Sequence, residues 1–141
     1  MIRIYSKVDP KVLCHMVLRN EEIVEERTDI IDADNFLQLS TLNMPKGKTF
    51  RPHKHIWKPG EKECIAQESW VVIQGKVKVF FFDTDGKSLQ EEFLYPGDSS
   101  ITLQGGHTYL SMEDNTKVYE YKTGPYKGCL LYTSPSPRDN R

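Results

Sequence analysis

The sequence has little of what would indicate a secreted, membrane or nucleic-acid-binding protein. It has three cysteines, Cys14, Cys64 and Cys129, and their odd number and spacing fit neither a disulfide framework nor a zinc motif. It contains no apolar run long enough to cross a membrane, and "MIRIYSKVDP" at the start lacks the apolar core of a signal peptide. The 19 basic and 20 acidic residues nearly cancel, which argues against a basic nucleic-acid surface. We therefore expect a cytoplasmic protein that binds neither membranes nor nucleic acid.

The end of the chain lacks the periodic pattern of a folded element. It reads "CLLYTSPSPRDNR" over residues 129–141. With one choice of codons, residues 129–139 back-translate to a transposase adaptor used in preparing sequencing libraries, read in frame. We predict that 129–141 are adaptor read-through and form a disordered tail. Residues 1–128 are then one domain, which suits the length of the chain.

The rest of the sequence has the pattern of short β-strands. In "KVKVFFF", Val77, Val79 and Phe81 alternate with residues of the opposite face, as in a strand with one buried face. Gly86 in "DTDGK" supplies the positive-φ position of a turn, and residues 89–94 return as the partner strand. Further strands are expected at 36–44, 99–103, 107–112 and 116–122, and 12–18 is either a strand or a short helix. Such strands are typical of a β-sandwich or barrel.

Two of the four histidines, His53 and His55, are separated by one residue. On a strand these positions share a face and lie about 7 Å apart, so their imidazoles can bind one ion at about 2.1 Å. By itself the pair is more often part of a solvated strand. The other ligands would have to come from elsewhere in the chain, and the candidates are Glu61, Glu63, Glu68 and His107.

The spacing around the pair resembles the first motif of the cupin superfamily. That motif has a glycine, five residues, His-x-His, a gap, a glutamate, six residues and a second glycine. The matching positions are Gly47, His53, His55, Glu68 and Gly75. The twelve residues between His55 and Glu68 are more than the family usually has, and we interpret them as a longer hairpin loop.

The second cupin motif is matched less closely by "GDSSITLQGGHTYLS", which runs from Gly97 through His107 to Ser111. Leu103 stands where proline is common, His107 comes one residue early, and Ser111 replaces a frequent asparagine. The resemblance covers about residues 36–122. It implies an all-β fold, the double-stranded β-helix of the cupin jelly-roll barrel.

The resemblance also implies a metal site. The ligands would be His53, His55, Glu68 and His107, with Glu61 as the alternative carboxylate, and the ion would be a divalent transition metal: Fe, Mn, Ni or Zn. The catalytic residues are not identified. Three residues, Trp70, Val72 and Tyr109, share strand parity with Glu68 or His107, so they either line a ligand pocket or pack in the core. Tyr119 and Tyr121 share one face of a strand, at the core or the rim.

Parts of the sequence, "ESWVVIQGKVKVFFFDTDG" and "YEYKTGPYKG", resemble small single-domain cupins encoded near polysaccharide and lipopolysaccharide biosynthesis genes. The main hypothesis is a metal-dependent enzyme that acts on a small polar molecule. In one version of this hypothesis the molecule is derived from a sugar. The alternatives are a non-catalytic sugar- or small-molecule-binding or regulatory cupin, and a metal-free sugar-nucleotide isomerase or epimerase. We expect a small-molecule ligand, and edge strands offer a route to a homodimer.

Overall fold

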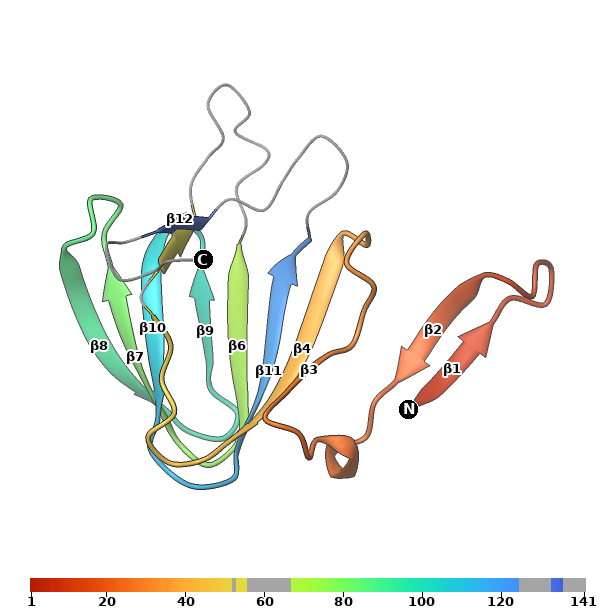
Figure 1. Cartoon of the computed structure of the whole chain (residues 1–141), viewed down its shortest axis with the longest axis horizontal. Coiled ribbons are helices and arrows are strands. Elements are labelled where there is room, and N and C mark those ends of the chain that lie inside the picture. The colour runs from red at the N-terminus through yellow and green to blue at the C-terminus, as the bar shows by residue number, and fades with distance from the viewer. Residues whose placement is uncertain (52, 56–66, 125–132, 136–141) are drawn as a thin grey trace.

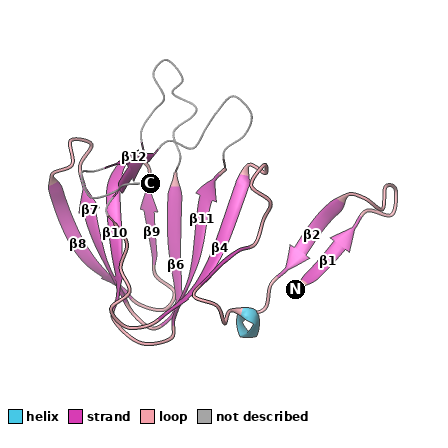
Figure 2. Cartoon of the chain, viewed as in Figure 1, coloured by secondary structure: helices cyan, strands magenta, loops and turns pink. Residues whose placement is uncertain are grey.

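The structure, a computed structural model, describes residues 1–51, 53–55, 67–124 and 133–135; for 53–55 and 133–135 it describes the backbone. Two five-stranded antiparallel sheets face each other and form an open-ended barrel (Figure 1). Strands dominate the described residues, and the one helical element among them is the short 3-10 helix η1 (Asn20–Glu22) (Figure 2). The predicted all-β double-stranded β-helix is therefore confirmed. Within the described part of the chain, no helix is long and apolar enough to cross a membrane.

The first sheet has the strand order β3-β4-β11-β6-β9. Its strands are β3 (Arg27–Asp29), β4 (Leu37–Met44), β11 (Thr116–Thr123), β6 (Glu68–Gln74) and β9 (Ser99–Thr102). Burial alternates strictly along β6, where Glu68, Trp70 and Val72 are buried and the residues between them are not. This confirms that these three residues share the inward face, as their parity predicts.

The second sheet has the order β12-β5-β10-β7-β8. Its strands are β12 (Thr133–Pro135), β5 (His53–His55), β10 (Gly105–Ser111), β7 (Val77–Phe82) and β8 (Ser88–Leu94). The turn between β7 and β8 has Gly86 at φ +88°, as predicted. β10 begins two residues earlier than the strand expected at 107–112, because Gly105 already pairs with the neighbouring β5.

The end of the chain differs from the disordered tail that the sequence predicts. Residues 133–135 pair with β5 as the edge strand β12. The remainder of 129–141 lies outside the described residues, and its origin as adaptor read-through stays a prediction. The hairpin loop predicted between His55 and Glu68 also lies outside the described residues, apart from Gln67.

A hydrophobic core fills the space between the two sheets. Each sheet contributes to one cluster of buried side chains: Leu42, Met44, Trp70, Val72, Val77, Val79, Leu94, Tyr109 and Val118. Burial of this apolar surface is the main force that holds the two sheets together. The core occupies the middle of the barrel, and polar residues lie around the start of β6.

A separate hairpin precedes the barrel. It consists of β1 (Ile2–Tyr5) and β2 (Leu13–Val17), which pair with each other as a two-stranded sheet. The segment 12–18 is therefore a strand and not a helix, and the sequence analysis did not anticipate β1. Figure 1 shows the hairpin standing away from both sheets, beyond η1.

Candidate functional site

A buried glutamate and a buried histidine meet across the barrel. Glu68 begins β6 in the first sheet, and His107 lies on β10 in the second. Their Oε2 and Nε2 atoms are 2.7 Å apart, and the side chains are 6% and 0% exposed. The fold thus brings together two of the four predicted metal ligands, although they lie 39 positions apart in the chain. A buried polar pair of this kind has to be mutually satisfied to be tolerated.

The other ring nitrogen of His107 contacts a hydroxyl. Its Nδ1 lies 2.6 Å from Oγ1 of Thr102, which ends β9. When Nδ1 carries the proton, it donates to Thr102, and the lone pair of Nε2 faces Glu68. In the other tautomer Thr102 donates to Nδ1, and Nε2 carries the hydrogen. Thr102 therefore fixes the orientation of the imidazole in both tautomers.

The backbone places the two motif histidines beside this pair. In the ladder between β5 and β10, His53 stands opposite His107 and His55 stands opposite Gly105. The backbones of three predicted ligands thus occupy neighbouring positions of one sheet, and Glu68 reaches His107 from the other. Glu61 lies outside the described residues. Among the described side chains, which do not include those of His53 and His55, no group of three or more histidine, cysteine, aspartate or glutamate residues comes together.

The three residues expected at a pocket or in the core, Trp70, Val72 and Tyr109, belong to the buried core cluster. The rings of Trp70 and Tyr109 are parallel, with centroids 3.7 Å apart, and the Tyr109 hydroxyl lies 2.9 Å from that of Ser100. Burial, reinforced by the negative charge of Glu68, raises the pKa of Tyr109 well above its ordinary value. These side chains fill the core of the barrel next to the Glu68–His107 pair, and the rings of His107 and Tyr109 are 4.9 Å apart.

A second buried carboxylate lies on the same inner face. Glu120 of β11 is opposite Trp70 in the ladder, and its Oε2 accepts a hydrogen bond from the Trp70 indole Nε1 at 3.1 Å. Its Oε1 accepts one from Arg27 Nη2 at 2.8 Å. Burial opposes the charge of Arg27, but the hydrogen bond to Glu120 and its charge outweigh burial and raise the pKa of the guanidinium. Lys122 Nζ lies 4.0 Å from Glu120.

In the sequence, the aromatic residues of "VYEYK" hide this network. The tyrosines 119 and 121 do lie on one face, with ring centroids 6.3 Å apart, but that face is the outside of the sheet. The buried positions of β11 are Thr116, Val118 and Glu120. The available signal was the spacing of Val118 and Glu120. The two residues are two positions apart on a strand, so an inward Val118 predicts an inward Glu120.

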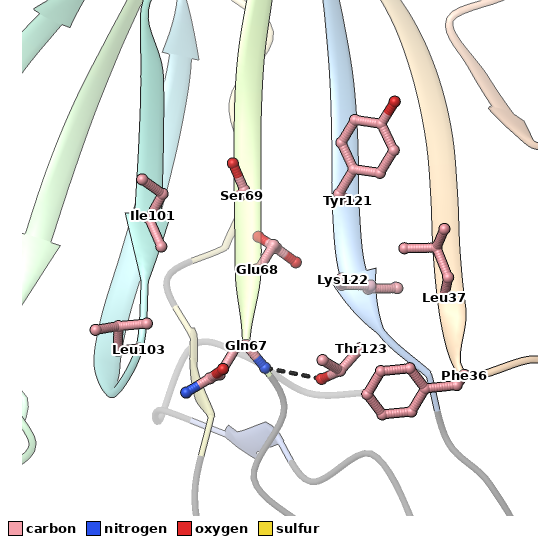
Figure 3. Close-up of a pocket in the computed structure, with 10 residues that line it drawn as sticks. All are labelled: Phe36, Leu37, Gln67, Glu68, Ser69, Ile101, Leu103, Tyr121, Lys122 and Thr123. Atoms are coloured by element: carbon pink, nitrogen blue, oxygen red, sulfur yellow. Dashed lines mark hydrogen bonds between the residues drawn. The ribbon is translucent and has the colours of Figure 1, made fainter.

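A shallow hollow of about 210 Å³ opens beside Glu68 (Figure 3). Its lining includes Glu68 and Lys122, which are ladder partners on β6 and β11. Its other walls are largely apolar and include Phe36, Leu37 and Ile101. The hollow gives the Glu68 end of the barrel a small accessible recess.

Comparison with solved structures identifies the architecture. The chain superposes on KdgF from Halomonas sp. with a TM-score of 0.60 and 16% identity, covering 83% of this chain and 100% of that one. A cupin superfamily protein from Desulfitobacterium hafniense matches with a TM-score of 0.52 and 13% identity over 77% of this chain and 84% of the other. The chain has the cupin fold. The DMSP lyase DddQ from Ruegeria pomeroyi has the same cupin architecture over 75% of this chain and 46% of its own length, with a TM-score of 0.52 and 15% identity.

These likenesses establish the fold alone, because all the identities are low. No protein-family model matches the chain. No curated protein matches it either. The site must therefore be judged on its own residues.

The donor set fits a divalent transition metal. Two ligands at about 2.1 Å and a right angle from one ion lie about 3 Å apart. The 2.7 Å between Glu68 Oε2 and His107 Nε2 requires a change of only a few tenths of an ångström. Imidazole and carboxylate donors are those that Fe, Mn, Ni and Zn accept. The contact with Thr102 is of the kind that orients a metal-ligating histidine.

Proposed function

We propose that the chain is a metal-dependent enzyme with the cupin fold, acting on a small polar molecule. The observation that carries the proposal is the buried contact between Glu68 and His107, with His53 opposite His107 in the adjacent ladder. In this proposal His53, His55, Glu68 and His107 hold one divalent ion of Fe, Mn, Ni or Zn. The ion supplies Lewis-acid or redox chemistry when bound.

The residues around the proposed ligands have distinct tasks. Thr102 accepts the Nδ1 hydrogen of His107, so that Nε2 is the nitrogen that donates its lone pair to the ion. The packed rings of Trp70 and Tyr109 exclude water on the core side of the site. Lys122, beside Glu68 and half-buried, is placed to orient a polar or anionic group of the substrate.

The polar character of the proposed substrate is supported by the inner face near Glu68. Several inward positions there are polar and buried: Gln38, Ser40, Ser100, Thr102 and Glu120. They are hydrogen-bonded within the chain and give this face a polar character. The proposal of a sugar-derived substrate rests on the sequence resemblance. The proposal of a cytoplasmic location rests on the three cysteines, which fit no disulfide pattern.

A metal-free acid–base enzyme is the second candidate, because a histidine in contact with a carboxylate can itself move a proton. The 2.7 Å contact between His107 and Glu68 favours it. Against it, Thr102 and Glu68 engage both ring nitrogens of His107, and the ring is fully buried. A base has to reach the proton that it removes, so we rank this candidate second.

Calorimetric titration with Mn²⁺, Fe²⁺, Ni²⁺ and Zn²⁺, each ion separately, tests the proposal on protein first treated with a chelator. We expect one ion to bind per chain, and His107→Ala and Glu68→Gln to weaken its binding at least tenfold. His15→Ala is the matched control, since His15 lies exposed on the separate hairpin, and it should bind like the unaltered protein. A folded protein that binds none of these ions would contradict the proposal and leave the acid–base enzyme as the leading candidate.

A further inference from the structure

Lys122 is a half-buried cation on the inner face of the first sheet. Val118 and Glu120, which share its parity on β11, are buried, and the side chain of Lys122 is 24% exposed. Its ladder partner is Glu68, so the β-carbons of the two residues lie about 5 Å apart. Figure 3 shows them at the same level of neighbouring strands. The ammonium group of Lys122 thus belongs to the same end of the inner face as the proposed metal site.

The described residues leave the hydrogen-bonding capacity of this ammonium group unused. An ammonium group has three N–H donors. Among the described residues, the ion-pair partner of Lys122 is Glu120, whose Oε1 lies 4.0 Å from Nζ, too far for a hydrogen bond. That oxygen already accepts a hydrogen bond from Arg27 at 2.8 Å. Burying a charge is costly unless the charge is paired, so a ligand with a negative charge would stabilise this lysine.

The charged side chains described at this end of the inner face nearly balance one another. Three are carboxylates and two are cations: Glu68, Glu120, Asp29, Arg27 and Lys122. They share one electrostatic field, since Glu68 interacts with Arg27. Lys122 interacts with Asp29 in the same way. The net charge of the five groups is −1, and one divalent ion, bound by neutral histidines as proposed above, changes it to +1.

Lys122 carries the excess positive charge when Glu68 binds the ion. The other cation, Arg27, is engaged by Glu120 at 2.8 Å and by Asp29 at 3.4 Å. A carboxylate that is shared with a divalent ion no longer neutralises the lysine beside it. A ligand with one negative charge restores the balance. A carboxylate has this charge at neutral pH, whereas a phosphate monoester carries about −1.5 to −2.

We infer that the substrate of the proposed enzyme is a small carboxylate anion, and that the ammonium group of Lys122 pairs with its carboxylate. The inference rests on the proposed function, because the excess positive charge arises only when the ion is bound. It makes Lys122 a specificity-determining residue. A neutral molecule of the same shape would leave the charge of Lys122 unpaired and would therefore bind more weakly.

Ligand-observed NMR titration of the full chain tests the inference, with the protein loaded with the ion that binds in the calorimetric titration. The probes are lactate and propane-1,2-diol, which have the same carbon skeleton and differ in that a carboxylate replaces a hydroxymethyl group. We expect the loaded protein to bind lactate about tenfold more tightly than the diol. Protein treated with a chelator should not have this preference. Inorganic phosphate, the third probe, should bind more weakly than lactate.

Substitutions of Lys122 separate its contribution from direct binding of lactate to the ion. Lys122→Met should weaken lactate binding at least fivefold and leave diol binding unchanged, whereas Lys122→Arg should retain most of the preference. Lys122→Gln repeats the test with a polar side chain, and circular dichroism checks that each variant is folded. Lys117→Met is the matched control, because Lys117 lies on the same strand with its Nζ 3.3 Å from the carbonyl of Asn20, and it should bind lactate like the unaltered protein.

The metal content of each sample distinguishes failure of this inference from failure of the proposed function. A folded chain that binds none of the ions contradicts the proposed function, and it overturns the inference as well, because the excess charge never arises. A loaded chain whose preference for lactate is the same in Lys122→Met overturns the inference alone. A loaded chain that binds phosphate more tightly than lactate overturns the assignment of a carboxylate.

Discussion

Replacing Gly75 by alanine should destabilise the barrel by about 3 kcal/mol. Gly75 links β6 to β7 at φ +82°, a conformation that costs an L residue about 1 kcal/mol. A Cβ built on it would lie 2.8 Å from Cα of Thr116 and closer still to the Thr116 hydroxyl. Thr116 is fully buried and donates a hydrogen bond to the carbonyl of Glu113 at 2.7 Å, so it cannot move aside easily. Overpacking at such a position adds about 2 kcal/mol.

Gly86→Ala separates the two contributions. Gly86 has nearly the same backbone conformation, φ +88°, but a Cβ there meets nothing within 4 Å. This variant should therefore lose about 1 kcal/mol, the conformational part alone. Equilibrium urea unfolding, followed by tryptophan fluorescence and circular dichroism, measures both values when the denaturant slopes agree. Equal losses for the two variants would refute the reasoning, because they would show that the close approach of Thr116 costs nothing.

Further predictions concern the buried charges and the response to pH. Arg27→Met leaves the buried Glu120 carboxylate with the more distant Lys122, 4.0 Å away, and should cost about 2 kcal/mol, less than for a fully buried pair because Arg27 is 39% exposed. Adding Glu120→Gln should recover part of that loss in a double-mutant cycle, whereas strictly additive losses would contradict the pairing. Because the pKa of Tyr109 is raised in the folded state, this residue's contribution to stability is complete below the ordinary tyrosine pKa and falls as pH rises above about 10. Up to pH 11, the tyrosinate absorbance of folded Tyr109→Phe should accordingly equal that of the unaltered protein. A lower absorbance in the variant would contradict the burial of Tyr109. Affinity for the proposed metal should fall below about pH 6.5, because imidazole binds metals in its neutral form; titrations that give the same affinity at pH 5.5 and 7.5 would contradict histidine ligation.

Much of the fold follows from strand periodicity. The alternation of Val77 and Val79 predicts β7, and the parity of Glu68, Trp70 and Val72 predicts one inward face, because a strand repeats every two residues whatever its neighbours. The turn at Gly86 follows from local chemistry in the same way. Features of this kind depend on residues adjacent in the chain, which is why the sequence is sufficient for them.

Features that depend on distant pairing could not be predicted with the same success. The contact between Glu68 and His107 requires the two sheets to face each other at one register, so the sequence could nominate both residues but not their separation. The inward position of Glu120 was hidden by the tyrosines on either side, whose apolar rings gave the outer face of β11 the stronger hydrophobic signal. The hairpin strand β1 was missed because its Ile2 and Ile4 alternate with Arg3 in a segment too short to distinguish from a loop.

Metal content of the protein as purified tests the central claim most directly. Full-length protein prepared without chelator or nickel resin would be analysed by elemental mass spectrometry beside His55→Ala and the control His15→Ala. We predict close to one Fe, Mn, Ni or Zn ion per chain, retained in His15→Ala and lost in His55→Ala. Folded protein that contains none of these metals, and that stays empty after incubation with each ion in turn, would contradict the proposed metal site.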